Sequence, residues 1–280
     1  MSKQFSDVAG QDARFGFGAN WARFLALVDD ERIALAEQSL RDMLERENLN
    51  GLRHLDVGSG SGLFSLAARN LGAVVHSFDY DPQSVGCTQA LRERYRPGDE
   101  NWIIERGDAL DEDYLAGLGT FDVVYSWGVL HHTGDMWSAL ENMTPLVNRR
   151  GQLFLALYND QGGGSKRWKT IKRLYVNGSI IRKWSLVSLV GTLFELRRFV
   201  ISMIRLQNPF KDMFSSSGNR GMSKLYDLVD WVGGHPFEVA KPEEVFEFFH
   251  ERGFHMQRLK TCGGGHGCNE YVFRKHFSEG

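Results

Sequence analysis

Short apolar runs alternate with helix-like segments between residues 50 and 160 of this 280-residue chain. Apolar runs of strand length, separated by segments of helical length, predict a parallel sheet with helices on both of its faces. The expected strands cover residues 52–57, 74–78, 102–104, 121–125 and 152–158.

Prolines and glycines mark the ends of the expected helices. These helices cover residues 82–96, 136–147 and 242–252. A turn at 148–151 is expected after the second of them. The amphipathic N-terminal stretch 20–47 predicts either one helix or two.

A glycine-rich turn follows the first expected strand directly and has the sequence Asp56-Val-Gly58-Ser-Gly60-Ser-Gly62. Glycines let such a turn bend tightly and bring a ligand against main-chain N–H groups at a helix start. The dinucleotide fingerprint requires a glycine three positions after Gly60, where this chain has Leu63. The turn therefore predicts a nucleotide-type ligand other than NAD.

Acids also follow the next two expected strands. Asp79 ends the second strand and precedes Tyr80, while Asp108 and Ala109 follow the third strand. In sheets of this kind, an acid at the end of the second strand holds a ribose diol. Asp79 is therefore the candidate for a ribose contact, and Asp81 is expected to cap the next helix.

The order of these features resembles class I S-adenosylmethionine (SAM)-dependent methyltransferases over residues 50–160. In that family, an acid two residues before the first glycine precedes the pattern G-x-G-x-G. The segment 126–132, Ser-Trp-Gly-Val-Leu-His-His, resembles the same region of ubiquinone and menaquinone biosynthesis methyltransferases. The resemblance implies SAM as cofactor, S-adenosylhomocysteine (SAH) as product, and an adenine contact from Asp108. The implied cofactor-binding residues are Asp56, Gly58, Gly60, Gly62, Asp79, Tyr80, Asp108, Ala109 and Trp127.

The resemblance also implies an α/β fold, a Rossmann-like doubly wound sheet. Seven mostly parallel strands are expected, with an antiparallel final strand and a helical lid insertion. The expected divisions are an N-terminal helical flap at 1–50, a SAM-binding core at 51–160, a basic and apolar helical insertion at 161–235, and a C-terminal helix and strand pair at 236–280.

Two histidines after the fourth strand are the first candidates for a catalytic base. Methyl transfer is an in-line displacement, so a base is needed only for a hydroxyl or acidic carbon nucleophile. His131 and His132 are suited to this role because imidazole titrates near neutral pH. Only one of them is expected to face the pocket, and each could instead cap or pack at a helix start.

The C-terminal part adds further candidates. Strands at 254–261 and 271–274 are joined by a glycine-rich turn, which the family's final strand pair would bring to the ligand-binding edge. His266 is then a catalytic candidate, and a flexible hairpin is the alternative reading of the turn. The expected substrate-binding residues are Tyr158, Asn159, Trp231, His235 and Asn269.

Metal binding is not expected in this turn. Cys262, His266 and Cys268 lie in one short segment without a visible fourth ligand, which falls short of the usual structural zinc spacing.

The net charge of −2 hides a basic segment at 165–211, which has eleven Lys and Arg residues against one acid, Glu195. Apolar residues are interleaved with these cations, as in an interfacial helix. One reading is a plain lid with solvated cations. The other is a lid that touches a membrane or binds a lipid-like or anionic substrate. Nucleic-acid binding is disfavoured, and homodimerisation is compatible with either reading.

The cysteine content and the start of the chain indicate the expected compartment. Three cysteines give no disulfide framework, and the start Met1-Ser-Lys-Gln lacks a signal pattern, so the cytoplasm is expected, with peripheral membrane contact through 165–211. The expected activity is methyl transfer to an oxygen or carbon of a small, apolar or lipid-linked acceptor. A soluble polar acceptor and a catalytically silent SAM-binding scaffold are the alternatives.

Overall fold

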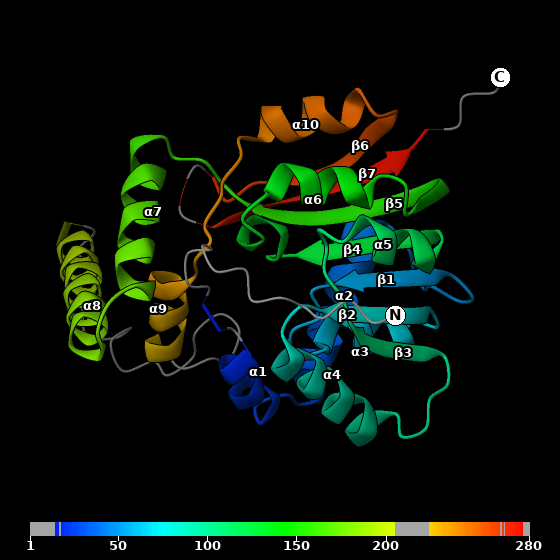
Figure 1. Ribbon diagram of the computed structural model, residues 1–280, viewed down its shortest axis with the longest axis horizontal. Coiled ribbons are helices and arrows are strands. Elements are labelled where there is room, and N and C mark those ends of the chain that lie inside the picture. Colours follow the sequence, from blue (N-terminus) through cyan, green and yellow to red (C-terminus); the bar gives the residue numbers. More distant parts are fainter. Residues whose placement is uncertain (1–14, 17, 205–223, 264, 266, 277–280) are drawn as a thin grey trace.

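A computed structural model describes residues 15–276 except 17, 205–223, 264 and 266 (Figure 1). His266 therefore lies outside the described residues. The sheet has the strand order β3-β2-β1-β4-β5-β7-β6. Its strands are β1 Arg53–Val57, β2 Val74–Asp79, β3 Trp102–Arg106, β4 Phe121–Trp127, β5 Val147–Tyr158, β6 Phe254–Lys260 and β7 Cys268–Lys275.

Strands β1 to β5 are parallel, and β7 is antiparallel to both β5 and β6. This arrangement confirms the expected seven-stranded α/β sheet. The order reverses between β1 and β4, and ligands of open α/β sheets bind beyond the carboxyl ends of the strands at such a switch point.

Helices cover both faces of the sheet. Buried side chains of α5 (Glu112–Leu118), α6 (Met136–Met143) and α10 (Pro242–His250) pack on one face, and those of α2 (Asp30–Leu44), α3 (Leu63–Asn70) and α4 (Pro82–Tyr95) on the other. Asp81 caps α4 by accepting a hydrogen bond from the Gln83 N–H at 2.9 Å, as predicted. The N-terminal stretch forms two helices, α1 (Gly18–Leu25) and α2.

The connection from α6 to β5 differs from the prediction. The helix ends at Met143, and β5 already begins at Val147, which pairs with Phe121 of β4. The turn expected at 148–151 is instead an irregular stretch inside β5, where Arg150 has φ +63° and the β4–β5 register shifts. Local turn residues predicted a break in the chain, but pairing with the neighbouring strand continues through it.

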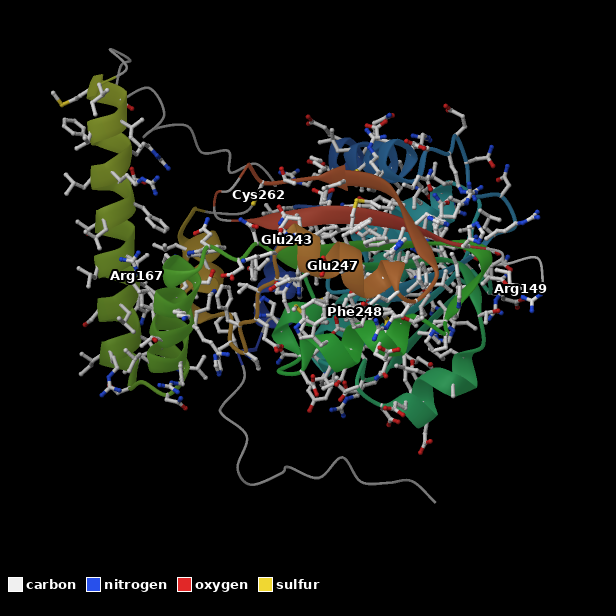
Figure 2. All side chains as sticks on the ribbon, turned by 90° about the horizontal axis from the view of Figure 1, so that it is seen from above. Arg149, Arg167, Glu243, Glu247, Phe248 and Cys262 are labelled. Carbon is white, nitrogen blue, oxygen red and sulfur yellow. The ribbon has the colours of Figure 1, made fainter. Side chains whose placement is uncertain are left out.

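The described residues of the insertion form three helices at one end of the sheet (Figure 1). They are α7 (Gly163–Val176), α8 (Ile180–Ile204) and α9 (Lys224–Gly233). Figure 2 shows α8 as the outermost helix, with α7 between it and the sheet. The reading of the cations as solvated is wrong for one of them, because Lys172 of α7 is fully buried. No helix in the described part of the chain is long and apolar enough to cross a membrane.

A buried histidine lies in the core of β1. The side chain of His54 is fully buried, and neither of its ring nitrogens has a hydrogen-bond partner in the described structure. Burial lowers the pKa of His54 from 6.5 to about 3. The folded protein thus resists protonation of His54, whereas the unfolded chain takes up that proton below pH 6.5.

We predict that His54→Leu leaves the unfolding free energy at pH 7.5 unchanged or raises it, because it removes two unsatisfied buried polar atoms. Below pH 6.5, the His54 side chain takes up a proton in the unfolded chain but not in the folded protein. The unfolding free energy of the wild type therefore falls as the pH falls below 6.5. The loss between pH 7.5 and pH 5 should therefore be smaller in His54→Leu by about 2 kcal/mol. Urea denaturation at both pH values measures this, with the exposed His255→Gln as control. Equal losses in wild type and His54→Leu would contradict the prediction.

Candidate active site

The glycine-rich turn joins β1 to α3 and lies against the end of β2. The N–H groups of Gly58 and Ser59 both donate to the Phe78 carbonyl oxygen, at 2.9 and 3.1 Å. Gly58 and Gly60 have φ values of +78° and +55°, which other residues rarely adopt. A Cβ at Gly58 would lie 2.4 Å from the Val129 side chain. The turn therefore requires glycine for both its backbone conformation and its close packing.

The carboxylate of Asp79 is tied to this turn. One oxygen accepts a hydrogen bond from the Gly60 N–H at 3.0 Å, and the other accepts from the Asp81 N–H at 2.9 Å. Burial raises the pKa of Asp79 to about 6, although these hydrogen bonds oppose the shift. The residue expected to hold a ribose is thus placed beside the expected cofactor turn.

Asp56 lies deeper than the other candidates. Its side chain is buried and accepts a hydrogen bond from the Ser65 hydroxyl. The Ser65 hydroxyl is also hydrogen-bonded to the Ser77 hydroxyl, with 2.7 Å between the two oxygens. The Trp102 indole N–H donates to the Ser77 hydroxyl at 2.9 Å. Burial raises the pKa of Asp56 to about 7, and the charge of Asp79 adds to the shift. Asp56 therefore connects the turn region to α3, β2 and β3 through a buried polar chain.

The remaining expected cofactor residues lie at the same edge of the sheet. Asp108 follows β3, and its carboxylate accepts from the Leu110 N–H at 2.9 Å. Ala109 is buried beside it, while Tyr80 is exposed after β2. Trp127 ends β4 and is partly buried. Their positions follow directly from the strand ends that the sequence predicted.

The N-terminal segment crosses this edge. The Gly18 N–H donates to the Asp81 carboxylate at 2.9 Å, and the Trp21 ring lies so close to Gly60 that a Cβ there would be 2.9 Å from it. At the other end of the segment, the Phe15 N–H donates to the His235 carbonyl oxygen at 2.9 Å. The segment thus contacts the glycine-rich turn at one end and the insertion at the other.

His131 lies in the 3-10 turn η1 (Leu130–His132) and is fully buried. Its Nδ1 accepts a hydrogen bond from the Tyr158 backbone N–H at 3.3 Å, and its Nε2 is buried without a described partner. Because a backbone N–H can only donate, a neutral His131 in this contact carries its proton on Nε2. Burial lowers the pKa of His131, and the charges of His132 and Lys172 add to this effect.

His132 has the opposite arrangement of its ring nitrogens. Its Nδ1 lies 2.6 Å from the Pro236 carbonyl oxygen, which can only accept. A neutral His132 therefore carries its proton on Nδ1 and a lone pair on Nε2. Burial and the charge of Lys172 lower the pKa of His132 to about 3. Of the two histidines, His132 has the tautomer of a base and His131 that of a hydrogen-bond donor.

Lys172 is the site residue that the sequence analysis missed. Its ammonium donates to the Trp231 carbonyl oxygen and lies over three aromatic rings. The distances from Nζ to the ring centroids are 4.9 Å for Trp231, 4.8 Å for Phe237 and 5.8 Å for Tyr158. Its spacing from Trp168 and Tyr175, at i−4 and i+3 on one helix face, was the available signal.

Aromatic residues from separate elements complete this cluster. The Tyr158 ring lies 3.9 Å from the His131 ring and 5.6 Å from that of Trp231. Trp231 in turn lies 5.5 Å from Trp168. Trp168 also lines an open hollow of about 400 Å³ with Gln161, Gly164, Arg167 and Ile171. The cluster therefore adjoins a hollow on the insertion.

The return from the insertion holds the cluster together. The Glu238 N–H donates to the His131 carbonyl oxygen at 3.0 Å, and the Ala240 N–H donates to that of Tyr158 at 3.0 Å. His235 is buried immediately before this segment. The structure thus brings His131, His132, Tyr158, Trp231 and His235 together, from parts of the chain up to 104 residues apart.

The final hairpin also lies at this edge. Cys268 pairs with Tyr158, at the carboxyl end of β5. The Asn269 side-chain amide donates to the Asn159 side-chain oxygen at 3.0 Å, and Asn269 also accepts from the Cys262 N–H. These two candidates therefore contact each other next to Tyr158. Within the described ranges, no cluster of metal-binding side chains is present.

Residues 55–153 match the family described as the methyltransferase domain. Ubiquinone biosynthesis O-methyltransferase of Caulobacter vibrioides is 30% identical over 142 residues, which cover 48% of this chain and 51% of the relative. The enzyme of the same name from Sinorhizobium medicae is 28% identical over 134 residues, covering 46% and 50%. The chain thus spans about half the length of the curated relatives that it matches.

Solved structures share the fold. Magnesium protoporphyrin IX methyltransferase from Synechocystis PCC 6803 with bound SAH has a TM-score of 0.53 at 16% identity, covering 92% of this chain and 94% of that one. An O-methyltransferase family protein from Burkholderia thailandensis has a TM-score of 0.55 at 12% identity, covering 96% and 66%. Residues 55–153 thus match the methyltransferase domain, and the chain as a whole shares the fold of these solved methyltransferase structures.

Proposed function

We propose that this protein transfers the methyl group of SAM to an oxygen of a small acceptor. The observation that carries the proposal is the Asp79 carboxylate, hydrogen-bonded to the Gly60 N–H where the glycine-rich turn meets β2. A carboxylate there can accept from a ribose diol while the turn leaves room for a ligand against its backbone. SAM bound there supplies an electrophilic methyl group on a sulfonium sulfur.

The other residues of the edge have roles that follow from their positions. Asp108 and Ala109 border the adenine, with Tyr80 and Trp127 at the sides of the cofactor. Asp56 acts as a positioning residue, because its carboxylate is buried against Ser65. The oxygen acceptor is suggested by the relatives named O-methyltransferases, and it binds on the Tyr158 side, between the cofactor and the insertion.

His132 receives a proton in this proposal. The Pro236 carbonyl oxygen holds its Nδ1–H, so Nε2 has the lone pair. Because the pKa of His132 is only about 3, it is a weak base. Such a base suits an acceptor with an acidic hydroxyl, such as a phenol, better than the hydroxyl of a sugar.

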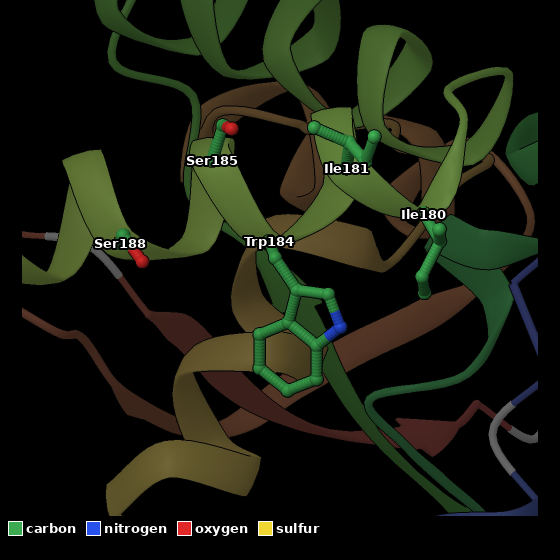
Figure 3. A pocket seen from close by; sticks show the side chains of 5 residues that line it. All are labelled: Ile180, Ile181, Trp184, Ser185 and Ser188. Atoms are coloured by element: carbon green, nitrogen blue, oxygen red, sulfur yellow. The ribbon is translucent and has the colours of Figure 1, made fainter.

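The exposed outer surface of α8 is an observation in favour of an apolar acceptor that is located in a membrane. Only Val187 and Val190 of its 25 residues are buried. Ile181 and Ile204 each expose 76% of their surface, and a shallow hollow is lined by Ile180, Ile181, Trp184, Ser185 and Ser188 (Figure 3). Exposed apolar side chains mixed with cations are typical of contact with anionic lipid. The proposed occupant of this surface is the face of an anionic bilayer.

Replacing Asp79 should weaken cofactor binding. Asp79→Asn removes the charged acceptor for a ribose diol, and we expect SAH to bind ten- to a hundredfold more weakly, since hydrogen bonds to charged groups contribute about 1.5–3 kcal/mol. Because the pKa of ligand-free Asp79 is about 6, wild-type affinity should also fall as the pH is lowered from 8 to 5. Titration calorimetry measures both effects, with Asp113→Asn on α5 as the matched control. An Asp79→Asn variant with wild-type affinity would refute the ribose contact.

Replacing His132 should separate turnover from cofactor binding. His132→Gln removes the proton-accepting Nε2, so we expect at least a hundredfold lower turnover at unchanged SAH affinity. The assay is transfer of label from methyl-labelled SAM into a total cell extract, which is then divided into lipid and aqueous fractions. Label in the lipid fraction supports the apolar acceptor, whereas label in the aqueous fraction contradicts it. Full turnover in His132→Gln would exclude His132 as the base.

Neutralising cations on α8 should weaken membrane contact. Each Lys or Arg near an anionic surface contributes about 1 kcal/mol, so Arg182→Gln with Lys183→Gln should lower retention on vesicles of phosphatidylserine and phosphatidylcholine about tenfold or more. Added salt should release the wild-type protein. The control is Arg94→Gln with Arg149→Gln, which removes equal charge elsewhere; Arg149 lies at the far end of the molecule from α8 (Figure 2). Retention independent of lipid charge and salt would favour a plain lid.

A further inference from the structure

Two buried groups beside Tyr158 form a pair of hydrogen-bond donors that the proposed roles leave unused. One is the Nε2–H of His131, from η1, and the other is the ammonium of Lys172, from α7. Both side chains are fully buried. The His131 ring lies 3.9 Å from the Tyr158 ring, and Lys172 Nζ lies 5.8 Å from the same ring centroid. They therefore border one aromatic side chain at the carboxyl end of β5.

The tautomer of His131 makes it a donor. Its Nδ1 is engaged by the Tyr158 backbone N–H, so the ring proton lies on Nε2. Within the described part of the chain, this nitrogen is buried without a partner. A buried N–H group in this state favours an oxygen acceptor from a ligand.

Lys172 adds its ammonium group to the same place. Its ammonium lies over the faces of Trp231 and Phe237, at 4.9 and 4.8 Å from their centroids, and donates to the Trp231 carbonyl oxygen. This charge is near enough to the two histidines to contribute to lowering the pKa of both. A buried cation beside a buried N–H donor is complementary to an anionic oxygen.

We propose that His131 and Lys172 form a subsite that binds an ionised oxygen of the acceptor, of the phenolate, enolate or carboxylate class. This inference rests on the proposed function and specifies its substrate class. An acceptor reaches the subsite from the hollow at Trp168, whose ring lies 5.5 Å from that of Trp231. When that oxygen is itself the nucleophile, its electron pair forms the bond to the methyl carbon. The carbon–sulfur pair returns to sulfur, and the hydroxyl proton has passed to His132 before this step.

The weak basicity of His132 agrees with this substrate class. A hydroxyl that ionises near neutral pH can lose its proton to a base as weak as His132 when Lys172 and His131 stabilise its anion. An alkyl hydroxyl would need a much stronger base than a buried histidine of this kind. The subsite thus selects acceptors by the acidity of their hydroxyl group.

The test uses 4-nitrophenol as the probe, because its ionised form has its own absorption band. Titrated with an excess of wild-type protein in the presence of SAH, the phenolate band should persist at least one pH unit lower than in buffer, a tenfold stabilisation of the anion. Lys172→Met should abolish this shift, and His131→Phe should reduce it. The exposed Lys169→Met, on the same helix, should retain it.

SAH binding, measured on each variant by calorimetry, verifies that the fold is kept. Lys172→Arg, which retains the charge, should preserve part of the shift if Lys172→Met proves unstable. The absence of a shift in the wild type, or an equal shift in Lys172→Met, would overturn the subsite. A wild-type protein that shifts the probe but does not bind SAH would instead overturn the proposed function and leave the subsite intact.

Discussion

The turn between β1 and α3 is the constraint on which the rest of the site depends. Its first two N–H groups donate to the Phe78 carbonyl oxygen near the end of β2, and a third donates to the Asp79 carboxylate. These bonds fix the start of α3 against the neighbouring strand, at the point where the strand order reverses. Every parallel strand ends at this edge of the sheet. The position of the turn between β1 and α3 therefore also determines where the acids after β2 and β3 can contact a shared ligand.

The second half of the site depends on how the insertion returns to the sheet. The segment 236–240 runs between η1 and the end of β5, and its backbone bonds to both. This return places α7 and α9 beyond β5 and brings Lys172 next to two histidines from a different part of the chain. Desolvation there lowers the pKa of both histidines, so the Lys172 ammonium lies among neutral rings on the acceptor side of the site.

The cations of the insertion therefore lie in two different environments. Those on α8 are exposed among apolar side chains, where salt screens them and a charged surface can attract them. Lys172 is withdrawn from water, where its charge acts at short range and at low dielectric. Basic residues thus contribute both to the proposed membrane-docking surface and to the proposed acceptor subsite. What distinguishes the two groups of cations is whether they are buried.

The sequence by itself determined the succession of strands and helices along residues 50–160 and the acids at the strand ends. These features are local: glycines at 58 and 60 allow left-handed backbone conformations, and a strand followed by Asp79 places that acid at the carboxyl edge of any parallel sheet. The glycine-rich turn, Asp79, Asp108 and the segment 126–132 therefore lie at one edge, because β1 to β4 pair in parallel.

Only the tertiary structure decided the environment of each polar group. The pattern of residues marked His131 and His132 as equivalent, but the Tyr158 amide and the Pro236 carbonyl give them opposite tautomers. Likewise, charge did not separate Lys172 from ten other cations, and its helical spacing from Trp168 and Tyr175 did not reveal its burial, which depends on rings from α9, the return segment and β5. Periodicity and motif spacing report on neighbours along the chain, whereas tautomer, charge state and burial depend on neighbours that meet only after folding.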